Sequence, residues 1–458
     1  MMLCFVSRQS VLALSLSGLA ALWLPAAYAL GLQDAYQAAL GHDPKFRAAQ
    51  KDLEASAESR AIGRSYLLPE VTFGASRGRN ALDRTVGRTS DSLNYDSSSA
   101  ALQLRQPLFN REFAARYRQG EVQARYGEVQ FAIRNNELIL RMLEAYTNLL
   151  LTYEQVNLAE AQASAYAEQL RSSERAFKLG EGTQTDVLEA RASHQLALAQ
   201  IIEARGGLDN AASILSGIIG PDLKAAPRHL GRQFDFVKLD PDSLEKWQVT
   251  ALDRSSEIEL RRQVVRNASE QLAIATAAQY PRLDLTASIS RSESDSINTI
   301  NQTNAQKSIG LQLNVPLYSG GRTSAQVRQS EATLGRAEAE LADITQEIEV
   351  ELRRQFNALQ GGAQRIDALG KALDSATLLI EATRKSVLGG VRVTLDVLNA
   401  EQRKYTVERD LAQARFTYLQ AWLRLRSAAG LLQPDDLAAM EGYLSPGSGA
   451  YMPMFSKP

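Results

Sequence analysis

The 458-residue chain has one cysteine, three histidines and no surplus of either charge sign. A single cysteine, Cys4, excludes a disulfide scaffold. The balance of 51 basic against 52 acidic side chains argues against a nucleic-acid partner, which calls for a basic surplus. His42, His194 and His229 are far apart and lack metal-binding spacing. We therefore expect no metal site, no cofactor and no catalytic residues.

Long apolar runs and evenly spread prolines are also missing. After the first thirty residues no run of eighteen or more apolar residues occurs, so no transmembrane helix is expected. Of the 13 prolines, none falls in the 113 residues between Pro107 and Pro221 or in the 117 residues between Pro316 and Pro434. Compact domains carry proline in their turns, whereas long helices exclude it. The gaps indicate two long helical regions.

The first 29 residues have the pattern of a secretory signal peptide. They contain one charge at Arg8, an apolar stretch over Val11–Leu24 and the ending Ala27-Tyr28-Ala29. A short N-terminal membrane anchor is the alternative. Cleavage after Ala29 removes the only cysteine, so the exported chain is stabilised by packing alone.

The remaining sequence contains a tandem repeat. Ala101–Phe109 resembles Gly310–Tyr318 at five of nine positions, with an offset of 209. Asp186-Val187-Leu188 recurs as Asp396-Val397-Leu398 with an offset of 210. The predicted organisation is a signal peptide at 1–29, repeats at 30–220 and 244–433, a linker at 221–243 and a tail at 434–458.

Each repeat shows the same order of predicted elements. A helix (32–66, then 244–279) precedes two strands that alternate apolar and polar residues, joined by polar loops at 80–94 and 292–305. Helices of 70 residues follow at 110–179 and 319–388, and helices at 186–219 and 396–425 return. Apolar residues recur in the long helices at steps of three and four, which predicts coiled-coil hairpins.

The strands raise the question of a membrane. Each alternating segment has about ten residues, the length that a tilted strand needs to cross a bilayer. Four strands cannot close a barrel, so strands that span a membrane must come from several chains. Aromatic residues at the strand ends fit an interfacial belt; they are Tyr66, Phe109, Tyr280 and Tyr318. Two soluble hairpins packed on the helices remain the alternative.

These features together resemble the TolC family of outer-membrane efflux and secretion channels. The most specific segments are Gly180–Ala190 (GEGTQTDVLEA) and Gly389–Glu401 (GGVRVTLDVLNAE). Within the family the chain is most similar to the type I branch that exports proteins, such as alkaline protease exporters. The resemblance implies a mainly α fold with a small β part: tandem coiled-coil hairpins and four transmembrane strands per chain. Three chains would share a twelve-stranded barrel and a periplasmic tunnel.

The resemblance also implies partners and a gate. The partners are two further copies, outer-membrane lipid, a periplasmic adaptor and an inner-membrane ABC or other export transporter. The implied gate links are Thr185, Asp186 and Arg392, and the implied luminal ring is Asp396 and Asn399. Two positions depart from the family, because Asn399 replaces a second aspartate and Val387 replaces an aromatic link. The alternative for Asp186 and Asp396 is a helix N-terminal residue favoured by the helix dipole.

The predicted function is a passive outer-membrane conduit, gated at its periplasmic end and driven by its transporter. The alternatives are a periplasmic coiled-coil adaptor or structural protein and, within the channel class, a multidrug efflux duct. An enzyme is not expected.

Overall fold

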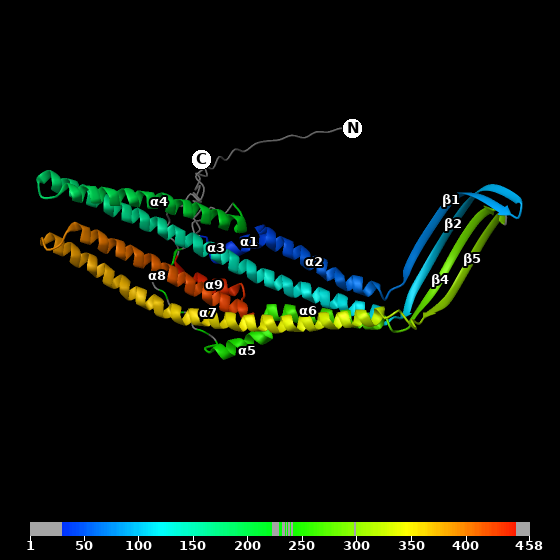
Figure 1. The fold of residues 1–458 in the computed structure, drawn as a ribbon. Helices are drawn as coiled ribbons and strands as arrows, with labels where there is room; N and C mark the ends of the chain where they lie inside the picture. The colour runs from blue at the N-terminus through cyan, green and yellow to red at the C-terminus, as the bar shows by residue number, and fades with distance from the viewer. Residues whose placement is uncertain are drawn as a thin grey trace, which may run out of the picture.

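The computed structural model is a long rod of helices with a curved sheet at one end (Figure 1). It describes residues 30–221, 229–230, 234, 236, 239, 241–296 and 299–445. The predicted signal peptide, most of the linker and the last thirteen residues lie outside the described residues. None of the described helices is long and apolar enough to cross a membrane.

The elements follow the same order in both halves. The first half contains α1 (Leu32–His42), α2 (Pro44–Ser65), β1 (Glu70–Val86), β2 (Thr89–Phe109), α3 (Arg111–Leu179) and α4 (Gln184–Ile219). The second contains α5 (Leu244–Arg254), α6 (Ser256–Ala277), β4 (Arg282–Ser296), β5 (Thr299–Asn314), α7 (Arg322–Leu388) and α8 (Thr394–Ala428). The short strands β3 (His229–Leu230) and β6 (Leu444–Ser445) pair, and α9 (Asp435–Glu441) precedes β6.

The long helical hairpins are confirmed. At 69 residues, α3 is about 104 Å long. The prediction of one continuous helix at the start of each half is wrong, because two helices, α1 and α2 or α5 and α6, occupy each of these segments. At Asp43 the side chain accepts a hydrogen bond from the Phe46 amide (2.7 Å) and Pro44 begins α2. In the second half the interruption falls at Ser255.

The four long strands form one antiparallel sheet in the order β1-β2-β4-β5. The predicted loops at 80–94 and 292–305 are wrong, because most of both segments is strand. β1 and β2 pair from Glu70↔Arg105 to Val86↔Thr89, which leaves only Gly87 and Arg88 as the turn. Gly87 has a φ of +66°, which favours glycine. The strands therefore have 15 to 21 residues rather than ten.

The two faces of the sheet differ, as the alternation predicted. One face, here called the apolar face, carries exposed side chains that include Phe73 (71% exposed), Ile309 (78%) and Leu311 (67%). No helix packs on either face of the described sheet. β1 and β5 are its outer strands, so each has one edge that no other described strand pairs with. An exposed apolar face and two open edges need a partner or a lipid environment.

The main core lies midway along the helical rod. It joins parts of all the described helices, α1 to α9, around fully buried side chains such as Leu138, Tyr146, Trp247 and Leu352. Closer to the sheet, α2 lies directly against α3 at Gly120. A Cβ atom there would be 2.4 Å from the Ser59 carbonyl oxygen. This glycine permits the close approach of the two helices.

Candidate gate at the helical tips and polar base of the sheet

The tip of the first hairpin is a capped turn. Gly180 ends α3 in the left-handed region (φ +76°), and Thr183 is the N-cap of α4. Asp186 Oδ2 accepts hydrogen bonds from Thr183 N (2.9 Å) and Thr183 Oγ1 (2.7 Å). Asp186 N donates to Thr183 Oγ1 (3.1 Å). This capping box confirms that Asp186 is a helix N-terminal residue.

The capping box has an electrostatic consequence. The hydrogen bonds from the Thr183 hydroxyl and amide favour the charged carboxylate and lower the pKa of Asp186. Because the pKa of Asp186 is lower in the folded state, these hydrogen bonds stabilise the folded tip at pH values above the ordinary aspartate pKa. The stabilisation is lost as pH falls through the folded value.

We expect Thr183→Ala to loosen the first turn of α4. Losing an N-cap of this type costs about 1 kcal/mol, or roughly a fivefold change in opening. Hydrogen exchange of the peptide 180–190 measures this opening. Acidification should narrow the difference from the wild type, because protonation of Asp186 weakens only one of the two Thr183 hydroxyl bonds that the variant lacks, the bond that the hydroxyl donates. Val393→Ala is the matched control, because the second tip has no side-chain cap. Equal exchange in the wild type and Thr183→Ala would contradict the assigned cap.

The tip of the second hairpin is built differently. Val393 occupies the N-cap position of α8 without a side-chain hydrogen bond. Asp396 is half-buried, whereas Asn399 and Arg392 are exposed. Within the described residues, the Arg392 guanidinium has no ion pair. Thr185 is exposed on α4. The pairing of Asp186 with Arg392 is expected between neighbouring chains, so it stays a prediction.

The two tips approach each other within one chain. A cavity of about 310 Å³ separates them and is lined by Asp186 from the first tip and by Val393 and Leu395 from the second. Farther from the tips, Tyr166 Oη of α3 donates to Gln402 Oε1 of α8 (3.3 Å). A small apolar cluster of Ala163, Tyr166, Ala197 and Leu398 also joins the two hairpins in this region.

Close to its tip, each hairpin is bridged by an Arg–Glu pair that was not predicted from the sequence. Glu174 of α3 pairs with Arg191 of α4 (3.2 Å), and Arg384 of α7 pairs with Glu401 of α8 (2.6 Å). Arg384 follows Glu174 by 210 residues, and Glu401 follows Arg191 by 210 residues. The two pairs therefore occupy equivalent positions in the repeats, with the acidic and basic residues exchanged. The repeat offset was the signal that could have revealed these pairs.

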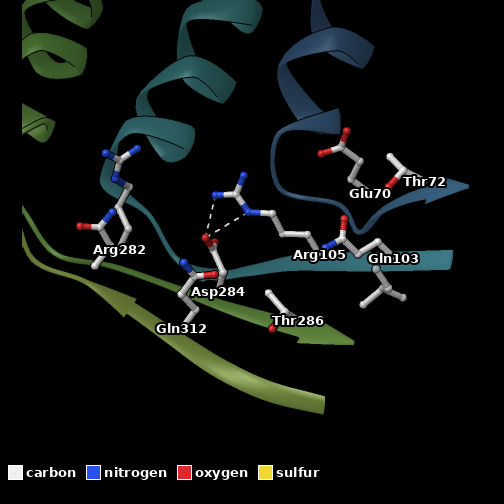
Figure 2. A pocket seen from close by; sticks show the side chains of 10 residues that line it. Glu70, Thr72, Gln103, Arg105, Arg282, Asp284, Thr286 and Gln312 are labelled. Carbon is white, nitrogen blue, oxygen red and sulfur yellow. Dashed lines mark hydrogen bonds and ion pairs between the residues drawn. The ribbon is translucent and has the colours of Figure 1, made fainter. Parts of the chain in front are cut away.

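A polar pocket of about 480 Å³ lies on the other face of the sheet, at its helical end. Figure 2 shows Arg105 of β2 reaching across to Asp284 of β4. Arg105 Nη2 lies 2.6 Å and Nε 3.1 Å from Asp284 Oδ2. The Asp284 side chain is only 9% exposed, and its Oδ1 has no partner among the described residues. This pair joins the two repeats, and the sequence predicted only the polar face on which it lies.

The four predicted interface aromatics all lie at this end of the sheet. Tyr66 and Phe109 are partly exposed, and Tyr318 is 89% exposed. Two arginines of α3 stack on the tyrosines: Arg116 over Tyr66 (5.4 Å) and Arg111 over Tyr280 (4.0 Å). Their role as a membrane-interface belt stays a prediction.

Comparison with known proteins decides the family. The family described as "Outer membrane efflux protein" matches residues 35–221 and 247–431. The chain belongs to this family. The match covers both hairpins and all four long strands, and it confirms the resemblance predicted from the sequence.

Individual relatives and a solved structure point to the same family. The chain is 41% identical to the alkaline protease secretion protein AprF of Pseudomonas aeruginosa, over 90% of this chain and 86% of AprF. It is 29% identical to the outer membrane protein TolC of Escherichia coli, over 95% of this chain and 88% of TolC. The fold matches the CmeC outer membrane channel of Campylobacter jejuni with a TM-score of 0.76 at 18% identity, covering 90% of each chain. This is an outer-membrane channel fold.

Proposed function

We propose that the protein is the outer-membrane duct of a type I protein secretion system. The observation that carries this proposal is the 41% identity to an alkaline protease secretion protein over most of both chains. The duct conducts cargo passively from the periplasmic tips of the hairpins to the exterior. The transporter supplies the energy.

The working form in this proposal is a homotrimer. The open edges of β1 and β5 support it, because each can continue the sheet by pairing with a neighbouring copy. Twelve strands then close a barrel with the apolar face towards lipid and the Arg105–Asp284 face towards the lumen. A periplasmic adaptor would join the tips to an inner-membrane ABC transporter.

Deleting the gene separates protein secretion from drug efflux. We expect the deletion strain to lose one or more secreted proteins from its culture medium, with drug sensitivity unchanged. Plasmid-borne wild-type protein should restore secretion. Unchanged secretion with increased drug sensitivity would instead support the efflux function that the family description also names.

In the proposed gate, Arg392 forms an ion pair with Asp186 of a neighbouring chain. We expect Arg392→Ser to raise the closed-state conductance of the channel in planar bilayers. The reason is that an exposed ion pair is weak, so loss of these links in all three chains should let the tips open more often. Arg191→Ser is the control, because Arg191 already pairs with Glu174 of its own chain. Unchanged conductance in Arg392→Ser would remove Arg392 from the gate.

A further inference from the structure

The apolar face of the sheet changes character partway along the strands. Near the helices its side chains are apolar, and farther out the same face becomes charged. On β1 the sequence passes from Phe73 to Arg77, on β4 from Ile289 to Arg291, and on β5 from Ile309 to Lys307. The boundary marks where an apolar membrane interior would end.

Lys307 stands apart from the other cations at this boundary. Arg77 lies 3.7 Å from Asp96, and Arg291 lies 2.7 Å from Glu293. Within the described residues, Lys307 has no carboxylate partner. Its register partner is Ile289, which in turn pairs with Leu102, so its row of the sheet is apolar. This exposed ammonium, on an apolar stem, can pair with an anion supplied from outside the chain.

A shallow groove of about 350 Å³ leads to this lysine. Its lining is almost wholly apolar, and Lys307 is its only charged residue; the apolar members are Val71, Leu102, Leu104, Ala287, Ile289 and Ile309. The groove crosses the face of the sheet instead of lying along an open edge. Pairing of β1 and β5 with neighbouring copies therefore leaves it uncovered.

We infer that Lys307 and this groove bind the phosphorylated, acylated glycolipid of the outer leaflet, with lipid A as its anchoring part. An acyl chain fits the apolar lining, and a phosphate meets the lysine. Lys307 lies about 23 Å along β5 from its helical end. The inference rests on the proposed function, because helices in the periplasm place this end of the apolar band in the outer leaflet.

Binding of fluorescent lipid A to the purified, delipidated channel tests the site. One positive charge near a lipid surface contributes roughly fivefold in affinity. We expect Lys307→Gln to bind lipid A about fivefold more weakly and Lys307→Arg to bind as the wild type does. Gln306→Glu is the matched control: it changes the net charge equally on the opposite face and should leave binding unchanged.

Three outcomes would overturn the inference. They are equal binding by the wild type and Lys307→Gln, equal binding of dephosphorylated lipid A, or equal binding of phosphatidylglycerol vesicles. Failure of the proposed function is distinguishable, because deleting the gene would then leave protein secretion unchanged while the purified wild-type channel still bound lipid A through Lys307.

Discussion

Leu104→Arg is expected to prevent assembly of the channel. Leu104 lies on the central strand β2, partly exposed on the apolar face, between Val71 and Ala287. An arginine facing the middle of a bilayer costs about 2–4 kcal/mol in a transmembrane strand. A trimer incurs this cost three times. We expect the trimer band on an unheated detergent gel to disappear.

The neighbouring residue provides the control for this prediction. Gln103→Arg introduces the same side chain one position along β2, on the polar face that lines the pocket in Figure 2. We expect it to assemble and to alter only ion selectivity. Equal loss of trimer in both variants would contradict the assignment of the two faces.

Trp247→Ala is expected to destabilise the middle of the rod. Trp247 is 1% exposed between α5 and the core, and its indole N–H donates to the Pro241 carbonyl oxygen (2.7 Å). Removing a buried tryptophan side chain costs about 3–5 kcal/mol per chain. We expect a clear fall in the temperature at which the trimer dissociates on a gel.

The same helix again supplies a control. Val249 of α5 is 69% exposed, so Val249→Ala should change stability by less than about 0.5 kcal/mol. If Trp247→Ala dissociates at the wild-type temperature, α5 is not a stabilising part of the core.

The helical part of the fold could be predicted because its signals are local. Apolar residues at steps of three and four and the absence of proline define α3 and α7. Glycines at the tips mark their ends. The break at Asp43 also had a signal, since an aspartate followed by proline is typical of a helix start. The second break, at Ser255, lacks the proline.

The outer halves of the strands could not be predicted from hydrophobicity. In this part of β2 both faces are polar, with Ser97 and Ser99 on one face and Asp96 and Ser98 on the other, so the segment resembles a loop. Backbone pairing along the whole hairpin holds it instead: Gly78 faces Ser97, and Asn80 Nδ2 donates to Ser97 Oγ (2.9 Å). Polar strands of this kind are compatible with water on both sides.

At the tips of the hairpins, the sequence suggested candidate residues but not the contacts that they make within the chain. The sequence identified Asp186 as either a gate link or a helix cap, and the structure shows the cap. The Arg105–Asp284 pair joins residues 179 positions apart, so it depends on the β2–β4 pairing between repeats. Such pairing is not visible in either strand alone.

Cross-linking of the sheet edges tests the shared barrel most directly. Thr72 on β1 and Ser308 on β5 lie in one cross-strand row through Gln103 and Ser288. The sequence after residue 29 has no cysteine, so a Thr72→Cys, Ser308→Cys variant carries only the introduced pair. Because the tilted strands of a barrel are staggered from one chain to the next, a long flexible linker is used, and it should join part of the outer-membrane protein into a ladder that ends at three chains. Single chains alone, or a ladder that continues beyond three, would contradict a closed trimeric barrel.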